Sequence, residues 1–441
     1  MVNSYKISDN KILTPQLLAE YIAYHDRQVL ERYDKLGKAY EAKYDLQKRA
    51  PKERWKPDNR MRVGFPRYLT DTFTGFFCGL SPKIEAEDER ANEALQDILT
   101  YTDFTDQISE LAKQSSIYGK AYAMAFVDRY GEIGTAVTNP RSSFVIEDEG
   151  IVPDARYFVH TYIDSENVRR GSFSDSRYIQ YFEINPDLRF IDEPVPHGFD
   201  GVPCVEFMDN TEKIGLFEQQ MDIITGYAKG LSYELDDIEG FASAILKVLG
   251  AKLDHDEMKA LRENQIINFE GGFDGNGLVV DFLQKPDGNA TQEAFLNRVE
   301  NLIFTLSMVE NLSDDKLAAS SGIALKYRLL SMYNLAAVKE RKFTISLKRL
   351  FRIICSNPVC ALQEDDFRDI TFTFYRNLPA NLVEEAQIAS TLSGITSHET
   401  QLGVLSIVPD AKAELEKIRE EAEEDLSLGY PTDRIADEEN E

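Results

Sequence analysis

Residues 310–330 read ENLSDDKLAASSGIALKYRLL, and the character of the sequence changes in the middle of this stretch. A polar, acidic segment gives way to a pattern typical of a long helix, and the residues before 310 also have helical spacing. The polar residues that stand out are Asp314, Asp315, Lys316, Ser320 and Ser321. Either serine can cap the following helix, because its hydroxyl can accept a hydrogen bond from a free backbone N–H. The stretch therefore predicts an acidic loop between two long helices.

The segment 216–249 predicts the first long helix before this loop. Its apolar residues recur at steps of three and four over a span of about 50 Å. Three glycines inside it each cost roughly 1 kcal/mol relative to alanine, so close helix packing or a bend should compensate. They are Gly226, Gly230 and Gly240. A second helix is predicted over 291–309.

Between these helices, residues 250–290 predict a small α/β unit. Asp254 and Glu257 suit the capping box of a short helix. The segments QIINF, GGFDGNG and LVVDFL, within 265–283, have the pattern of a strand, a turn and a strand. Two helices thus bracket a small knob of chain.

A third long helix is predicted over 322–355, and its charge is opposite to that of the chain as a whole. Against the single acid Glu340 it carries Lys326, Arg328, Lys339, Arg341, Lys342, Lys348, Arg349 and Arg352. Such a face needs an acidic neighbour or, alternatively, is simply solvated. We interpret it as a face that could offset acidic surfaces of the two preceding helices.

The rest of the chain mixes helices and strands. A helical segment over 17–46 and a basic, proline-broken connector over 48–62 precede an aromatic segment, and several strands are expected between 120 and 184. A strand returns near 370–376, and residues 381–426 have helical character throughout. The segment from 429 onward is acidic and expected to be disordered. The fold class predicted is α+β, predominantly helical.

Composition limits the function. The chain has 441 residues, 43% of them hydrophobic, and a net charge of −27, which argues against wrapping nucleic acid by neutralising its phosphates. No apolar run reaches the roughly 20 residues of a membrane span, and the first residues lack a signal peptide, so we expect a cytosolic protein and no membrane contact. The four cysteines have no C-x-x-C spacing and are expected to be buried free thiols.

No motif predicts catalysis, a cofactor or a metal. A P-loop is absent, and SDDK at 313–316 matches S-x-x-K without the motifs that accompany it in β-lactamases. The five histidines stand alone, without the spacing of zinc ligands. Acidic pairs such as Asp236 with Asp237 could hold a divalent ion, but they are weak evidence in so acidic a chain. We therefore predict no enzyme activity.

The order of these elements over nearly the whole chain resembles that of tailed-bacteriophage portal proteins from siphophages and prophages. Four segments carry the resemblance: RMRVGFPRYLTDTFTGFFCGLSPKI at 60–84, VPHGFDGVPCVEFMDN at 195–210, SSGIALKYRLLSMYNLAAVKERKF at 320–343, and FYRNLPANLVEEAQIASTLSGITSHETQL at 374–402. None of them is a catalytic motif. Their order and the lengths of the segments between them make the match specific.

The resemblance implies a domain organisation. Residues 1–215 would form an α/β wing together with a returning strand at 366–378. Residues 216–249 and 291–309 would be the stem helices, 250–290 the clip and 310–321 the tunnel loop. Residues 322–365 would be the long wing helix with its connector, 379–428 a helical crown and 429–441 the acidic tail.

The resemblance also implies partners. Portal proteins form a ring, usually of twelve copies, at one capsid vertex, through which double-stranded DNA enters and leaves. The expected partners are the terminase large subunit, the major capsid and scaffolding proteins, and a head-completion adaptor. The clip would dock terminase and adaptor, with Phe273, Asp274 and Asn276 as candidate contacts. The protein would belong to the virion, after assembly in the host cytoplasm.

Two other classes of protein remain as alternatives. One is another head-completion or adaptor ring protein of the same assembly. The other is a metal-dependent nuclease that uses scattered carboxylates. The acidic loop itself favours the portal interpretation, because a channel wall must touch DNA without holding it, and each phosphate neutralised by Lys or Arg would add affinity.

Overall fold

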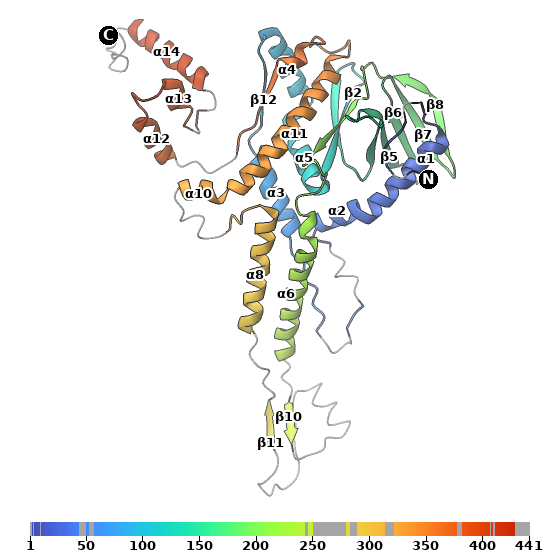
Figure 1. Ribbon diagram of the computed structural model, residues 1–441, viewed down its shortest axis with the longest axis vertical. Coiled ribbons are helices and arrows are strands. Elements are labelled where there is room, and N and C mark those ends of the chain that lie inside the picture. Colours follow the sequence, from blue (N-terminus) through green and yellow to red (C-terminus); the bar gives the residue numbers. More distant parts are fainter. Residues whose placement is uncertain are drawn as a thin grey trace. The chain divides into compact units, whose positions relative to one another are not determined.

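A computed structural model describes residues 2, 4–8, 10–43, 50–52, 57–242, 246–249, 279–282, 289–313, 322–376, 382–405, 407–408 and 411–427 (Figure 1). The chain divides into two compact units. The first consists of Met1–Asn311 and Ser331–Arg376, and the second of Leu312–Leu330 and Asn377–Glu441. Helices and antiparallel sheets occur together in the first unit, so the α+β class is confirmed.

A five-stranded antiparallel sheet forms one half of the first unit. Its order along the sheet is that of the sequence: β4 (Ser143–Glu147), β5 (Ala155–Ile163), β6 (Arg169–Ser174), β7 (Tyr178–Ile184) and β8 (Leu188–Pro196). One face is apolar and packs against α1 (Pro15–Gln28), where Phe144, Val159 and Phe182 meet Leu18 and Ile22. A strand presents alternate residues to opposite faces, which is why one face can be apolar while the other is mixed.

The side chain of Thr14 caps the N-terminus of α1, and two further helical segments follow α1 directly. The hydroxyl of Thr14 accepts a hydrogen bond from the N–H of Leu17 at 3.2 Å. A π-helical turn, Val29–Tyr33, joins α1 to α2 (Asp34–Tyr40). The helix predicted over 17–46 is thus present as three consecutive segments, but it ends at Tyr40. Residues 41–43 are not helical, and 44–46 lie outside the described residues.

A second core lies between the three-stranded sheet and three helices. The sheet has the order β3 (Ile133–Thr138), β2 (Lys120–Val127) and β9 (Cys204–Met208). The helices near it are α3 (Phe65–Cys78), α5 (Phe104–Tyr118) and α11 (Leu330–Cys355). Phe343 of α11 is fully buried and makes edge-to-face contacts with Phe77 and Phe207. Aromatic side chains from three distant segments thus hold α11 in this core.

Two further short strands pair across a long stretch of sequence. The strand β12 (Ile370–Thr373) lies antiparallel to β1 (Lys83–Ala86), with Lys83 opposite Thr373. The helix α4 (Glu89–Tyr101) follows β1, and Asp88 caps it by accepting a hydrogen bond from the N–H of Ala91 at 2.9 Å. The returning segment at 366–378 therefore contains a strand, as expected from the sequence.

Two long helices, α6 (Met221–Ala242) and α8 (Asn289–Ser307), pack side by side (Figure 1). The prediction of a helix as far as residue 249 is wrong at its end, because Leu246–Leu249 forms a strand, β10. This strand pairs antiparallel with β11 (Val279–Phe282), so that Leu246 lies opposite Phe282. The strand predicted in LVVDFL is present as β11. Its partner is β10, which lies 30 or more positions earlier in the sequence. The capping box, the strand QIINF and the turn GGFDGNG lie outside the described residues.

The long helix predicted over 322–355 consists of two helices. They are α10 (Gly322–Arg328) and α11, with a turn at Leu329 between them. The C-terminal region also contains separate helices rather than continuous helix: α12 (Leu382–Thr391), α13 (His398–Leu402) and α14 (Ala411–Ser427). Gly394, at φ +76°, and Ser397, which caps α13, separate the first two. The tail at 429–441 lies outside the described residues. In the described part of the chain, every helix is too short or too polar to span a lipid bilayer.

Candidate functional site

The residues predicted for the loop and the clip lie outside the described part of the chain. They are Asp314, Asp315, Lys316, Ser320 and Ser321 of the loop and Phe273, Asp274 and Asn276 of the clip. The structure therefore describes the elements on either side of each segment, and these elements define how the chain enters it.

The chain leaves α8 toward the loop through a fixed turn. Met308 has a positive φ of 59°, and Val309 is buried. The N–H of Glu310 points to the sulfur of Met332 on α11, at 3.4 Å. Because Met332 is itself buried, the start of the loop is attached to the beginning of the long helix α11.

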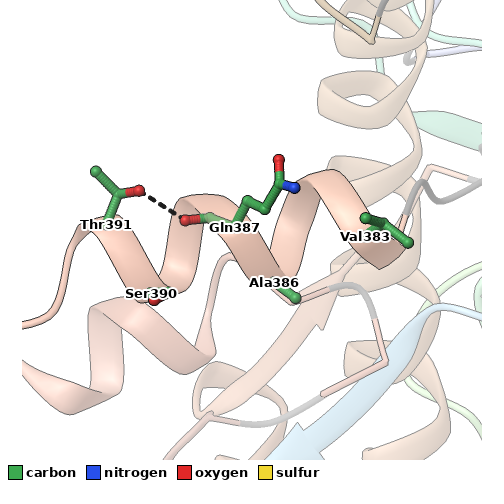
Figure 2. Close-up of a pocket in the computed structure, with 5 residues that line it drawn as sticks. All are labelled: Val383, Ala386, Gln387, Ser390 and Thr391. Carbon is green, nitrogen blue, oxygen red and sulfur yellow. Dashed lines mark hydrogen bonds between the residues drawn. The ribbon is translucent and has the colours of Figure 1, made fainter.

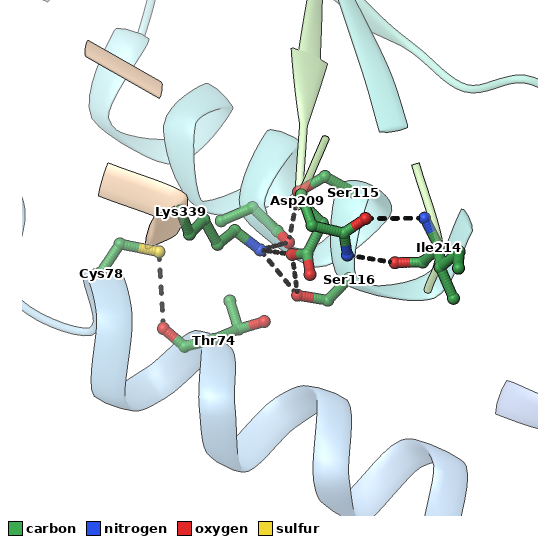
Figure 3. Close-up of polar contacts among 9 residues, drawn as sticks. Thr74, Cys78, Ser115, Ser116, Asp209, Ile214 and Lys339 are labelled. Atoms are coloured by element: carbon green, nitrogen blue, oxygen red, sulfur yellow. Dashed lines mark hydrogen bonds and ion pairs between the residues drawn. The ribbon is translucent and has the colours of Figure 1, made fainter. Parts of the chain in front are cut away.

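A buried lysine fixes the middle of α11 (Figure 3). The ammonium group of Lys339 donates hydrogen bonds of 2.7 Å to the carbonyl oxygen of Ala112, the hydroxyl of Ser116 and Oδ1 of Asp209. A lysine ammonium has three N–H donors, and here each has an acceptor. The contact joins three elements: α11, α5 and the end of β9.

The buried position of Lys339 corrects one prediction from the sequence, which places this lysine on the basic face of the helix. The aromatic rings of Phe73, Phe77 and Phe343 surround its ammonium group at 5.4–5.5 Å from their centroids. Such rings attract a cation through their negative faces. Lys339 also occupies a position in the buried series Ala336, Lys339, Phe343. This spacing of three and four residues is the feature of the sequence that indicates a buried position for Lys339.

A second ionic cluster lies at the start of β2. Lys120 and Lys213 both bind the carboxylate of Glu206, Lys120 at 3.3 Å. Burial would raise the pKa of Glu206, but the two ammonium groups outweigh burial and lower it. Burial lowers the pKa of Lys120, but Glu206 together with Tyr122 and Tyr33 outweighs burial and raises it. Both groups therefore stay ionised and form a structural pair rather than an acid and a base.

His25 lies near this cluster in an aromatic setting. Its Nδ1 is 2.9 Å from the hydroxyl of Tyr5, and its ring centroid is 4.5 Å from that of Phe144. Burial, reinforced by the charge of Lys120, lowers the pKa of His25 to about 3. The imidazole is therefore neutral in the folded protein at physiological pH.

The two long helices meet closely near their middle. Gly230 of α6 faces Leu296 of α8, and a Cβ at this glycine would lie 2.8 Å from the end of the leucine side chain. Nearer the rest of the unit, Phe304 of α8 makes an edge-to-face contact with Phe65, which contacts Tyr227 in the same way. Of the three glycines in this segment, Gly230 thus allows the close helix packing that the sequence predicts.

The basic connector lies against the other side of α6. Asp236 binds the ammonium group of Lys52 and accepts a hydrogen bond of 2.6 Å from the N–H of Asn59. One turn earlier, the hydroxyl of Ser232 accepts a hydrogen bond of 2.9 Å from the N–H of Met61. Asp236 is mostly buried, and each of its two carboxylate oxygens has a partner in the connector. This carboxylate therefore fixes the connector to α6.

One stripe of apolar residues on α8 is exposed. Phe295 is 59% exposed, Leu302 39% and Leu306 50%. Their spacing of seven and four residues places them on one face of the helix. Monomeric proteins rarely leave such a stripe in water, so it is a candidate surface for another chain.

The C-terminal helices also lack a core of their own. None of the side chains described between 383 and 421 is buried. Figure 2 shows a shallow pocket on α12, which is lined by Val383, Ala386, Gln387, Ser390 and Thr391. The hydroxyl of Thr391 donates to the carbonyl oxygen of Gln387 at 2.7 Å, so this hydroxyl is used within the helix itself.

Groups capable of catalysis are dispersed. In the described ranges, no three His, Cys, Asp or Glu side chains are placed to hold a metal ion. The four cysteines are free thiols, of which Cys78, Cys204 and Cys355 are buried and Cys360 is half-buried. Burial raises the pKa of the Cys78 and Cys204 thiols, which keeps these groups protonated and unreactive.

Comparison with known proteins agrees with a structural role. The family described as phage portal protein, SPP1 Gp6-like, matches residues 19–427. The portal protein of Clostridium phage phiCD119 is 23% identical over 367 residues, which cover 77% of this chain and 79% of that relative. The portal protein of Bacillus phage SPP1 is 25% identical over 396 residues, which cover 83% of this chain and 76% of that relative.

Proposed function

The chain belongs to the SPP1 Gp6-like family of phage portal proteins, and from this premise we propose that its copies close into a ring at one capsid vertex. Double-stranded DNA would enter and leave the capsid through this ring. The ring would later join head to tail. The observation that carries the proposal is the exposed apolar stripe of Phe295, Leu302 and Leu306 on α8. A closed ring covers the same surface in every subunit and leaves none of it in water.

The proposed organisation follows the order of the elements. The wing comprises residues 1–215 and the returning strand at 366–378, and the stem comprises α6 and α8. The clip comprises residues 250–290 and also includes β10, which pairs with β11. The tunnel loop is 310–321, the wing helix with its connector 322–365, the crown 379–428 and the acidic tail 429–441. None of the described side chains between 383 and 421 is buried, which supports a crown that gains its core from neighbouring copies.

DNA passage requires a bore with little affinity for phosphate. The net charge of −27 supports this, because a wall of like charge repels the duplex. At physiological salt the repulsion reaches only about 8 Å, so the charge of the narrowest part matters most. We assign that part to residues 310–321, with Asp314, Asp315 and Lys316 exposed to the bore and Ser320 and Ser321 at its edge.

The partners follow from the position at a capsid vertex. The clip would bind the terminase large subunit during packaging and the head-completion adaptor afterwards. The wing would contact the major capsid and scaffolding proteins. The protein would thus assemble in the host cytoplasm and end in the virion.

The size and shape of the purified protein test the ring. Twelve copies of the 50.2 kDa chain would weigh about 600 kDa, and class averages should show a stem below a flared wing. A stable 50 kDa species at micromolar concentration in light scattering would refute the ring. A thin ring without a stem would indicate an adaptor instead.

The clip has a separate test. Replacing residues 274–277, which include Asp274 and Asn276, by another four-residue turn should leave the ring intact and weaken stimulation of the terminase ATPase. Phe273→Ala is the matched single change at the same turn. Loss of the ring in either variant would show that the segment lies inside the assembly and does not dock a partner.

A further inference from the structure

The exposed face of α11 combines charge and apolar surface in one stripe. Val338, at 37%, and Ile345, at 52%, are exposed. Between and beyond them lie four exposed basic residues: Arg341, Lys348, Arg349 and Arg352. At 100° per residue these six side chains fall within a stripe about 100° wide. The opposite face of α11 is the buried one that carries Lys339 and Phe343.

None of the ion pairs in the described part of the chain involves these four basic residues. The nearby acid Glu340 is bound to Arg376 instead. Each basic residue therefore keeps its charge available for a group outside this chain. We refer to Val338, Arg341, Ile345, Lys348, Arg349 and Arg352 as the α11 stripe.

The same unit presents an equally unpaired acidic helix face. Glu89, Glu93 and Asp97 are exposed on α4 and take part in none of the described ion pairs. Residues 87–106 contain seven acidic residues and one basic residue, Arg90. Arg90 is already engaged with Asp366 at 2.9 Å. We call Glu89, Glu93 and Asp97 the α4 face.

The geometry points to the following inference, which rests on the ring proposed above. We propose that the α11 stripe of one subunit packs against the α4 face of the next copy around the ring. In a head-to-tail ring, one surface of each subunit meets a different surface of its neighbour, so a single chain must carry both halves. The stripe and the face lie in the same compact unit, so every interface repeats the same pairing.

The spacing of the charges agrees with this pairing. Carboxylates at positions i, i+4 and i+8 of α4 span about 12 Å, and Arg341 to Arg352 on α11 span about 16 Å. Two helices at the usual distance could therefore place each carboxylate near a basic side chain. Complementary charges at such an interface set the register and the choice of partner more than the affinity.

A second copy explains the stripe better than DNA does. Val338 and Ile345 lie among the basic residues, and a phosphate backbone offers such side chains no apolar surface to pack against. A basic face turned toward the bore would also hold the duplex and oppose its movement. A protein helix with a charged face can instead cover the aliphatic side chains and pair with the charges.

Charge reversal tests the inference on the full-length chain. The first variant is Arg341→Glu/Lys348→Glu/Arg352→Glu, and the second is Glu89→Lys/Glu93→Lys/Asp97→Lys. Each alone places like charges at every interface, so light scattering should show loss of the ring. An equimolar mixture of the two, or one chain with all six changes, pairs opposite charges again and should restore the ring. Lys11→Glu/Lys35→Glu/Lys38→Glu makes the same charge change at exposed sites elsewhere and should leave the ring intact.

The other outcomes overturn the inference. A first variant that forms rings of wild-type mass would show that the stripe is not an interface, and the proposed function would stand. Loss of the ring without restoration by the six changes would mean that another surface covers the stripe. Intact rings with at least tenfold weaker binding to a short duplex would assign the stripe to DNA. A wild-type chain that never forms a ring would instead refute the proposed function.

Folding of the first variant needs its own control. Circular dichroism should give an unfolding midpoint close to that of the wild type, since the stripe is exposed. If the midpoint falls, Arg341→Gln/Lys348→Gln/Arg352→Gln serves in its place. This neutral variant should raise, at least tenfold, the concentration at which half of the chains are in rings. An unchanged concentration would overturn the inference.

Discussion

Lys339 Nζ and Asp209 Oδ1 lie 2.7 Å apart, and the two side chains are only 1% and 8% exposed. One belongs to the middle of α11 and the other to the end of β9, 130 positions away in the sequence. Taking two charges out of water costs several kcal/mol each, so the pair persists only because Ala112 and Ser116 supply the remaining hydrogen bonds. The pair thus determines where α11 sits in the core.

Removing one partner of this pair should be costly. Lys339→Met leaves the carboxylate of Asp209 buried without its cation, and we expect the free energy of unfolding in urea to fall by about 3–5 kcal/mol. Lys339→Met/Asp209→Asn should recover at least about 1 kcal/mol of this loss. Lys35→Met, at an exposed position of α2 away from the α11 stripe, should change stability by no more than about 0.5 kcal/mol. A loss below about 1 kcal/mol for Lys339→Met would contradict the importance of the pair.

Gly119 and Gly131 offer a matched test of close backbone packing. Both have a left-handed backbone, with φ of +83° and +85°. A Cβ at Gly119 would lie 2.0 Å from the carbonyl oxygen of Lys213, while a Cβ at Gly131 would meet nothing within 4 Å. Gly131→Ala should therefore cost only the conformational penalty of about 1–2 kcal/mol, and Gly119→Ala should cost at least about 2 kcal/mol more. Equal losses in thermal or urea unfolding would show that the backbone around Lys213 can move aside.

His25 makes stability depend on pH in a defined direction. Its pKa is about 3 in the folded protein and near 6.5 when unfolded, so the unfolded chain binds the proton more readily. The stabilisation is fully present above pH 6.5 and is lost as the pH falls toward 3. Between pH 7.5 and 5.0 the loss from this residue should be about 2 kcal/mol.

The variant His25→Phe separates the loss of stability in acid that is due to His25 from the loss that is due to protonation of carboxylates. Phenylalanine fits the aromatic surroundings but cannot be protonated. At pH 7.5 it should cost about 1 kcal/mol, because the hydroxyl of Tyr5 loses its hydrogen-bond partner. Its unfolding free energy should then fall less steeply with acid than that of the wild type. His398→Gln, at an exposed histidine, should leave the slope unchanged, and an unchanged slope in His25→Phe would mean that His25 does not titrate as inferred.

The sequence predicted the long helices because their periodicity is local. It misplaced the end of the first one, since the apolar residues of Leu246–Leu249 continue the same spacing while the chain forms a strand there. A strand forms only when its backbone can hydrogen-bond to a partner strand. Here the partner, Val279–Phe282, lies 30 or more positions away in the sequence. Short apolar segments cannot be assigned to helix or strand by periodicity alone.

The buried ion pair could not be predicted for a similar reason. The excess of Lys and Arg over residues 322–355 suggests that Lys339 belongs to a basic face. Its position in the series Ala336, Lys339, Phe343 indicates a buried site instead. No pattern in the sequence connects it with Asp209, because that contact depends on how α11 packs on α5 and β9. The roles of the loop and clip residues follow from the resemblance to portal proteins and stay predictions.

The acidic loop provides the last test, and it bears on DNA movement. We predict that Asp314 and Asp315 line the narrowest part of the bore and that their charge limits adhesion of the duplex. Asp314→Lys/Asp315→Lys replaces two negative charges by two positive ones in each subunit. Around a ring these changes form a collar that binds phosphate. Rings should still assemble, while packaging should slow or stall at low salt and recover as the salt concentration rises.

Two controls make this test specific. Asp314→Asn/Asp315→Asn removes the repulsion without adding attraction, so its packaging rate should lie between those of the wild type and the lysine variant. Asp187→Lys/Glu193→Lys makes the same charge change at exposed positions near β8 and should package normally. Because counterion release makes phosphate binding weaken steeply with salt, a defect caused by adhesion must ease between low and high salt. A lysine variant that packages at the wild-type rate at both salt concentrations would remove this loop from the path of the DNA.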